Sequence, residues 1–166
     1  RIVRSMTFPK MMIWNDPSER FSRPVRWIIA RHGDRSIPVE MFGVRSDSFS
    51  EGHRVLGAGR VTVGSYDDFI TRLQQNFVIV SQEERKRKIE AELQRAASPI
   101  GKIITDDRLL EEVVYINEYP TVVGGEFDLR FLELPREILI TVMKEHPKYF
   151  AVENDHGQLL PHFFAV

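Results

Sequence analysis

The spacing of apolar residues along the chain predicts four helices. In each, apolar side chains recur three or four positions apart, as on the buried face of an amphipathic helix. Ser65 and Ser81 each stand three residues before an acidic residue, the spacing of an N-terminal capping box. Pro135 stands at a helix start, where its missing N–H has no partner to lose. The predicted helices are residues 65–76, 81–98, about 107–117 and 135–146.

Shorter stretches predict β-strands, because they alternate apolar and polar residues or form brief apolar runs. Residues 25–31 and 36–42 flank Gly33 and Asp34, which suit a two-residue hairpin turn with glycine first. Residues 43–64 contain five glycines, and we expect them to form a long, ordered connection. The remaining predicted strands are residues 60–63, 77–80, 121–123, 149–153 and 159–166.

The order of these elements favours an α+β fold, because strands and helices mix without a strict βαβ alternation. We expect a mainly antiparallel or mixed β-sheet with about four helices packed on it. With 166 residues, 42% of them apolar, the chain is long enough to form a single domain over residues 1–166. It starts without a methionine and stops inside an apolar run, so we expect it to be a piece of a longer polypeptide.

Patterns that would indicate catalysis or metal binding do not occur. The chain has no cysteine, and its five histidines lack the spacing of metal ligands. We find no nucleophile motif and no phosphate-binding glycine loop. We therefore expect no catalytic residue, no metal site and no cofactor in this segment. No apolar stretch has the length of a membrane span and no secretory leader is recognisable, so we expect a soluble, cytoplasmic protein with no membrane partner.

Charge is unevenly distributed, although the net charge is only −1. Residues 1–60 hold 11 Lys and Arg against 6 Asp and Glu, and ten of those 11 cations are arginine; residues 61–166 hold 12 against 18. Arginine suits bidentate contact with phosphate. Two explanations remain open: a polyanionic partner, or internal pairing of these arginines with the acidic second part.

Seven residues are candidates for a cationic binding surface: Lys10, Arg23, Arg26, His53, Arg54, Lys144 and Lys148. An alternative for His53 and Arg54 is that they fasten the glycine-rich connection through backbone carbonyls. We predict that Arg23 lies at the rim of the sheet and Arg26 near Glu40, with at least one held by an acidic partner, because burying an unpaired guanidinium is costly. Residues 85–88 (RKRK) are interleaved with glutamates, which favours a solvated helix face over a nucleic-acid patch.

Eight blocks of sequence, from about Phe8 to Val166, resemble the N-terminal part of the β subunit of bacterial-type glycyl-tRNA synthetase. They are FPKMMIW, FSRPVRW, FGVRSD, EGHRVLG, SQEERKRKI, LLEEVVYINEYP, FLELPREILITVMKEHPKYF and GQLLPHFFAV. The chain departs from the family pattern at Ile13, where a basic residue is usual, and at Tyr119, where tryptophan is usual. The first departure removes one cation from any contact surface near Trp14.

The resemblance implies an α2β2 ligase that joins glycine to its tRNA with ATP, the α subunit carrying the adenylate-forming site. The β subunit would supply tRNA binding and stability, so this segment would hold neither ATP nor glycine. The leading interpretation is an accessory tRNA-binding domain that contacts glycine tRNA through its cations. A second is a scaffold that docks the α subunit or other β domains. A third is an editing-type hydrolytic module, which needs a pocket for an aminoacyl-adenosine end.

Overall fold

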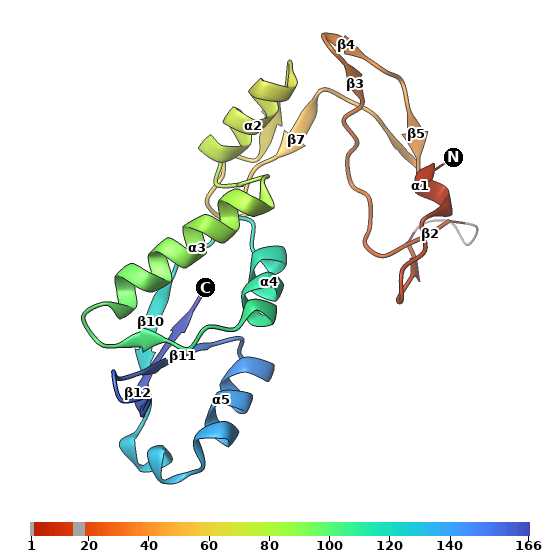
Figure 1. Ribbon diagram of the computed structural model, residues 1–166. Helices are drawn as coiled ribbons and strands as arrows, with labels where there is room; N and C mark the ends of the chain where they lie inside the picture. Colours follow the sequence, from red (N-terminus) through yellow and green to blue (C-terminus); the bar gives the residue numbers. More distant parts are fainter. Residues whose placement is uncertain (1, 15–18) are drawn as a thin grey trace. The chain divides into compact units, whose positions relative to one another are not determined.

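A computed structural model describes residues 2–14 and 19–166 (Figure 1). The chain divides into two compact units, residues 1–77 and 78–166, and each is described by itself. Within the described residues there are five α-helices and a short 3-10 helix, and every strand pair is antiparallel. The predicted α+β class is therefore confirmed. No described helix has both the length and the apolar character that crossing a membrane requires.

The first unit is built from short hairpins and one longer helix. Its described elements are α1 (Ile2–Ser5), β1 (Met12–Ile13), β2 (Arg20–Phe21), β3 (Arg31–His32), β4 (Arg35–Ser36), β5 (Glu40–Met41), β6 (Val44–Arg45), β7 (Phe49–Glu51), β8 (Arg60–Thr62) and α2 (Tyr66–Gln75). Each strand pairs with its neighbour in sequence to give two-stranded ribbons. Val61, Val63 and Leu73 are its buried apolar residues in the described part.

The predicted hairpin turn is confirmed, but the predicted strands around it are too long. Arg31 pairs with Ser36 across Gly33, which has φ +56°. The ladder continues only to the bond from the Ile37 N–H to the Ala30 carbonyl (2.8 Å). Pro38 then has no N–H to donate, so pairing stops there. Residues 25–30 are consequently not a strand, apart from a single parallel bridge between Ile28 and Ser46.

The predicted glycine-rich connection contains two further strands. β6 closes a hairpin with β5, and β7 pairs with β8, so residues 52–59 are the longest loop that remains in this connection. The prediction of a strand over 77–80 is wrong. Phe77 follows the end of α2 with φ +59°, the left-handed conformation that commonly terminates a helix. Residues 78–80 then run without a ladder, although the Ile79 N–H donates to the Glu118 carbonyl (2.9 Å).

The second unit is a four-stranded antiparallel sheet with helices on both faces. Its elements are α3 (Gln82–Ala97), β9 (Lys102–Ile103), α4 (Asp107–Ile116), β10 (Val123–Glu126), η1 (Leu129–Glu133), α5 (Arg136–Glu145), β11 (Phe150–Glu153) and β12 (Leu159–Ala165). The strand order is β10-β12-β11-β9. The strands predicted at 149–153 and 159–166 are confirmed, whereas the strand predicted at 121–123 begins only at Val123.

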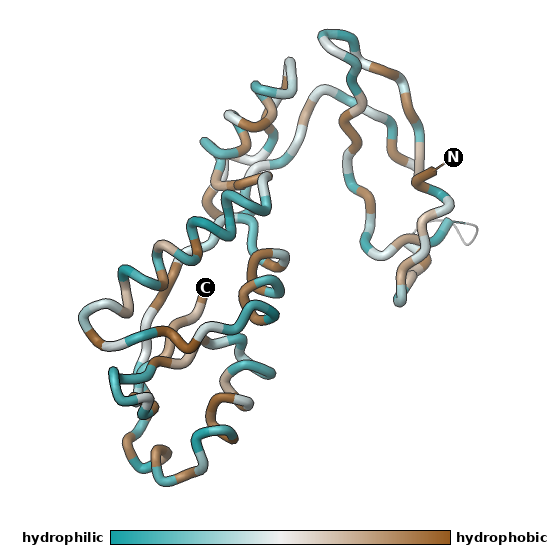
Figure 2. Tube along the Cα trace, viewed as in Figure 1, coloured by the Kyte–Doolittle hydropathy of each residue, from teal (hydrophilic) through white to brown (hydrophobic). Residues whose placement is uncertain are grey.

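Alternation along the strands decides which helices cover which face. Phe150 pairs with Phe164, and both belong to the core that α3 and α4 complete with Ile89, Leu93 and Val113. The opposite face carries Phe163, on which Tyr149 stacks at 4.3 Å between ring centroids. Helix α5 is tied to this face by an ion pair from Arg136 to Glu153 (2.6 Å). Figure 2 shows that α3, by contrast with the strands, is mostly hydrophilic along its length.

The four predicted helices are confirmed, and local signals explain their ends. The Ser65 and Ser81 hydroxyls accept hydrogen bonds from the N–H groups of Asp68 and Glu84, three residues on. Asp106 caps α4 in the same way, through the Leu109 N–H. Pro135 stands just before α5, whose first residue is Arg136. These bonds satisfy N–H groups that the first turn of a helix leaves without partners.

Candidate nucleic-acid interface

Four of the predicted cations lie on the surface of the first unit. Lys10 lies between α1 and β1, Arg23 and Arg26 lie between β2 and β3, and Arg54 lies in the loop between β7 and β8; all four are exposed. Within residues 2–14 and 19–166, none of them forms an ion pair with an acidic side chain. No carboxylate of the described residues therefore competes with an anionic partner for these cations.

The acidic partner predicted for Arg23 or Arg26 is not found among the described residues. Glu40, which we expected near Arg26, instead accepts a hydrogen bond from the Arg45 guanidinium at 2.8 Å. The two residues face each other across the β5–β6 hairpin, whereas residues 25–30 form no ladder with β5. Because both arginines are exposed rather than buried, water solvates them and no partner is required.

The other arginines of the first unit differ, because most are engaged within it. Arg60 contacts Glu51 (3.6 Å) and lies over the Phe49 ring, 4.1 Å from its centroid. Arg72 pairs with Asp68, and Arg31 donates to the Asp34 carbonyl (2.8 Å). Two more arginines, which sequence reasoning did not single out, are exposed and lack an acidic partner in the described part of the chain: Arg20 and Arg35.

An aromatic cluster stands beside Arg23. Phe21 meets Phe8 and Phe42, each at 5.1 Å between ring centroids. Trp14 donates its indole N–H to the Phe21 carbonyl (3.1 Å) while its side chain stays 39% exposed. Arg23, Trp14 and Phe42 line the same small hollow. A cation next to an exposed aromatic ring is the combination that binds unpaired nucleotides, by phosphate contact and base stacking.

His53 serves the loop that contains it. Its Nδ1 accepts hydrogen bonds from the N–H groups of Val55 and Leu56, both at 3.2 Å. The backbone N–H of His53 donates to the Asn76 carbonyl (2.9 Å), which ties the loop to the end of α2. His53 therefore holds the glycine-rich connection, but its ring does so through N–H groups rather than through the carbonyls that the alternative named. Arg54 donates to no backbone carbonyl in the described structure.

The two lysines predicted from the second unit are engaged with carboxylates. Lys144 pairs with Asp106, and Lys148 pairs with Glu112 (2.7 Å), so both link the α5 region to α4. The hydrogen bond from Lys144 lowers the pKa of Asp106 below its ordinary value. The hydrogen bond from Lys148 does the same for the pKa of Glu112. The structure therefore does not bring these lysines together with free cations; each is matched by a negative charge.

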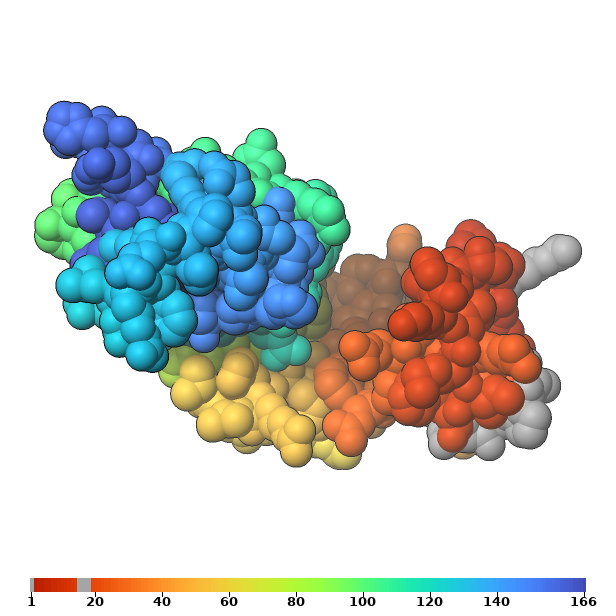
Figure 3. Space-filling view, turned by 90° about the horizontal axis from the view of Figure 1, so that it is seen from below, coloured from red at the N-terminus to blue at the C-terminus, as the bar shows by residue number. Residues whose placement is uncertain are grey.

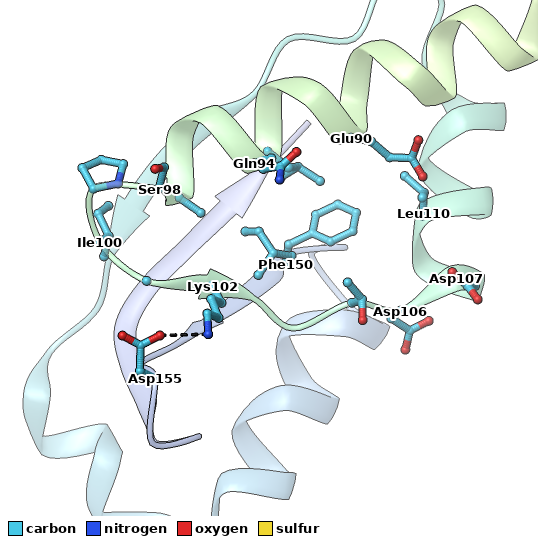
Figure 4. Close-up of a pocket in the computed structure, with 16 residues that line it drawn as sticks. Glu90, Gln94, Ser98, Ile100, Lys102, Asp106, Asp107, Leu110, Phe150 and Asp155 are labelled. Atoms are coloured by element: carbon cyan, nitrogen blue, oxygen red, sulfur yellow. Dashed lines mark ion pairs between the residues drawn. The ribbon is translucent and has the colours of Figure 1, made fainter.

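A pocket of about 870 Å³ lies in the second unit between α3, β9 and the start of α4 (Figure 4). Phe150 and Leu110 contribute to its apolar floor, and its rim carries Glu90, Asp107 and the Asp155–Lys102 ion pair (2.9 Å). The volume suits a ligand of nucleoside size. The acidic rim, however, repels the phosphates of an RNA end.

Two carboxylates of this pocket, Asp155 and Asp106, are poorly suited to act as a general base. Lys102 lowers the pKa of Asp155 by hydrogen bond and charge, so Asp155 accepts a proton poorly at neutral pH. Asp106, likewise lowered in pKa, already receives the Lys144 ammonium and the Leu109 N–H. Among the described residues, no three His, Asp or Glu side chains gather closely enough to hold a metal ion. The pocket has room for the aminoacyl-adenosine end of a tRNA, but neither Asp106 nor Asp155 is suited to act as the general base of an editing reaction.

Comparisons with known proteins agree with the sequence blocks. The model of the family described as "Glycyl-tRNA synthetase beta subunit" matches residues 1–166. Similar proteins include the "Glycine--tRNA ligase beta subunit" of Listeria monocytogenes serotype 4a (46% identical over 167 residues) and that of Syntrophus aciditrophicus (41% over 167 residues). Each alignment covers 100% of this chain but 24% of the relative. The chain thus spans about a quarter of the length of these relatives.

Proposed function

Because the chain belongs to the glycyl-tRNA synthetase beta subunit family, we propose that it is part of a glycine–tRNA ligase and contributes to the binding of glycine tRNA. The remaining polypeptide and an α subunit complete this enzyme in an α2β2 assembly in the cytoplasm. ATP and glycine bind outside residues 1–166, in the α subunit. The part played by this chain is to hold tRNA rather than to form the adenylate.

One observation supports this role above the others. Lys10, Arg23, Arg26 and Arg54 are exposed and have no acidic partner in the described part of the chain, although carboxylates engage several neighbouring arginines. Exposed guanidinium groups that the fold does not use are suited to the phosphate backbone of RNA. The exposed Trp14 beside Arg23 adds a surface for an unpaired base.

The test compares two triple variants in the assembled enzyme. In the first variant, alanine replaces Arg23, Arg26 and Arg54. In the control variant, alanine replaces three arginines that form ion pairs: Arg45, Arg60 and Arg72. Both variants lose three positive charges, so the long-range attraction between enzyme and tRNA falls equally in the two. Losing three phosphate contacts is expected to weaken binding of glycine tRNA about tenfold or more at 150 mM salt. It is also expected to reduce the slope of log K against log salt by about 2.

Affinity is measured by filter binding across a salt series. Thermal unfolding of both variants shows whether the fold survives the substitutions. If tRNA affinity is unchanged in the first variant, or falls equally in both, the exposed cations have no specific role. If the first variant instead loses its α subunit while retaining affinity for tRNA, the scaffold interpretation replaces the proposal.

A further inference from the structure

An apolar stripe runs along the outer side of η1 and α5. It consists of Phe131, Leu134, Ile138 and Val142, which follow one another at intervals of three, four and four residues. Their exposed fractions are 40%, 46%, 52% and 51%. Ile138 and Val142 share one side of α5 because they lie four residues apart in it. Phe131 belongs to η1, and Leu134 lies between the two helices. Figure 3 shows residues of this segment, in cyan to blue, at the surface of the second unit.

The apolar residues of helix α5 extend beyond the side that the helix buries. Its inner side presents Met143, which is buried, and the half-buried Leu139 and Ile140. At 100° per residue, Ile138 and Val142 lie about 125° round the helix from this inner side. A surface helix buries a single apolar stripe, whereas these two side chains leave further apolar surface open to contact. The apolar stripe therefore has the composition of a second, unfilled interface.

Acidic residues border the stripe. Glu133, Glu137 and Glu145 are exposed, and none forms an ion pair within residues 2–14 and 19–166. The nearby Lys144 does not offset them, because Asp106 already holds it. Arg130, which lies over the Phe131 ring, is in turn paired with Asp128 (3.3 Å). An apolar stripe with a negative border repels RNA and suits a helix that has apolar residues in one row and basic residues beside it.

We propose that a basic amphipathic helix, from the part of the same polypeptide outside residues 1–166, covers the apolar stripe. Similar β subunits are about four times as long as this chain, so most of the polypeptide of those relatives lies outside the matched part. A segment of the same chain reaches the stripe at a high effective concentration, which a separate partner lacks. The proposal is independent of tRNA binding, since it concerns neither the first unit nor its exposed cations.

The experiment measures accessibility in the full-length β subunit. Ile138→Cys and Val142→Cys are introduced singly, in a background without other reactive cysteines, and labelled with a maleimide. Lys86→Cys, on the exposed side of α3, is the control. With the β subunit alone, both stripe positions are expected to react at least about tenfold more slowly than the control, because a cover must open first. Adding the α subunit or tRNA is expected to leave these rates unchanged.

A second variant tests the chemistry of the cover. Glu133, Glu137 and Glu145 are replaced together by lysine, which leaves the apolar side chains in place. Labelling of the Val142→Cys variant is then expected to accelerate several-fold, because like charges loosen the covering helix. Labelling at the control rate in the β subunit alone overturns the proposal. Protection from labelling that appears only after the α subunit or tRNA is added also overturns the proposal. An unchanged labelling rate in the lysine variant shows that the covering segment is not basic.

Discussion

Arg85 illustrates how one side chain can join segments that are distant in sequence. It is 9% exposed and donates hydrogen bonds to the carbonyls of Val114 (3.0 Å), Ile79 and Val80 (3.0 Å). The guanidinium thus holds the approach to α3 against α4. The solvated-face interpretation of RKRK is wrong for this residue, whereas Lys86 and Arg87 are exposed as predicted. Its position four residues before the buried Ile89 was the signal that could have identified it.

Replacing Arg85 by methionine is expected to lower the free energy of unfolding by about 2–3 kcal/mol, because three carbonyls lose a charged donor in a buried place. Lys86→Met, one position along on the exposed side, is the matched control and is expected to change it by less than about 0.5 kcal/mol. Urea unfolding followed by circular dichroism measures both. Equal effects in the two variants would contradict the role of Arg85.

Asp106 predicts a pH dependence. Its pKa is lowered below 3.8 in the folded chain, chiefly by the hydrogen bond from Lys144. A lowered pKa contributes stability that is present above pH 3.8 and is lost as the pH falls through the folded-state pKa. Asp106→Asn keeps an N-cap oxygen but loses the charge, so it is expected to cost at most about 1 kcal/mol at pH 7. The difference in stability between the wild type and Asp106→Asn should therefore shrink below pH 3.8.

Thermal unfolding from pH 7 to pH 3 follows this difference. Asp106→Ala, which removes the cap as well, is expected to be less stable than the asparagine variant by about 1 kcal/mol at both ends of the range. A gap between the wild type and Asp106→Asn that stays constant with pH would show that the ion pair is not its cause.

At the scale of elements, close backbone approach decides where β9 can pair. A Cβ on Gly101 would overlap the Glu153 carbonyl oxygen and come within 2.9 Å of the Leu160 side chain. Glu153 belongs to β11, the neighbour of β9 in the sheet. Glycine is therefore needed at this edge for a steric reason, and no local pattern in the sequence indicates it. Helix ends differ, since Ser65, Ser81 and Asp106 bond to groups only three residues away.

Gly101→Ala is expected to destabilise the chain by about 1–3 kcal/mol, because a backbone carbonyl cannot rotate away as a flexible side chain can. Ser98→Ala, in the same loop but exposed, should lie within about 0.5 kcal/mol of the wild type. Denaturant unfolding distinguishes the two. An alanine at 101 that is tolerated as well as the one at 98 would show that β9 does not hold its place against β11.

At the scale of the whole molecule, the two units differ in how much they bury. The second unit encloses a continuous core of ten buried residues that includes Ile89, Val113, Phe150, Val152 and Phe164. In the first unit, no residue of the described stretches 2–14 and 19–49 is buried. The single domain expected for residues 1–166 stays a prediction. Since burial resists local opening, stability should be distributed unevenly along the chain.

Hydrogen exchange measured by mass spectrometry should show this unevenness. Amides of β11, β12 and the inner turns of α3 are expected to exchange about a hundredfold or more slowly than those of β1 to β6, because their opening exposes the core. The exchange of α2, which buries Leu73, should be intermediate. Protection of residues 20–45 equal to that of β11 would contradict this picture.

The sequence by itself determined the family, through its blocks of similar residues. It also determined the α+β class and the four longer helices, because capping bonds and apolar periodicity act within a few residues. Only the tertiary structure decided which cations are free. Lys144 and Lys148 found carboxylates on and beside α4, whereas Arg23, Arg26 and Arg54 found none in the described chain. Pairing of charges depends on which distant segments pack together, and composition cannot reveal that. The same reason explains why residues 25–30 and 77–80 failed as strands, since a strand needs a neighbour to bond.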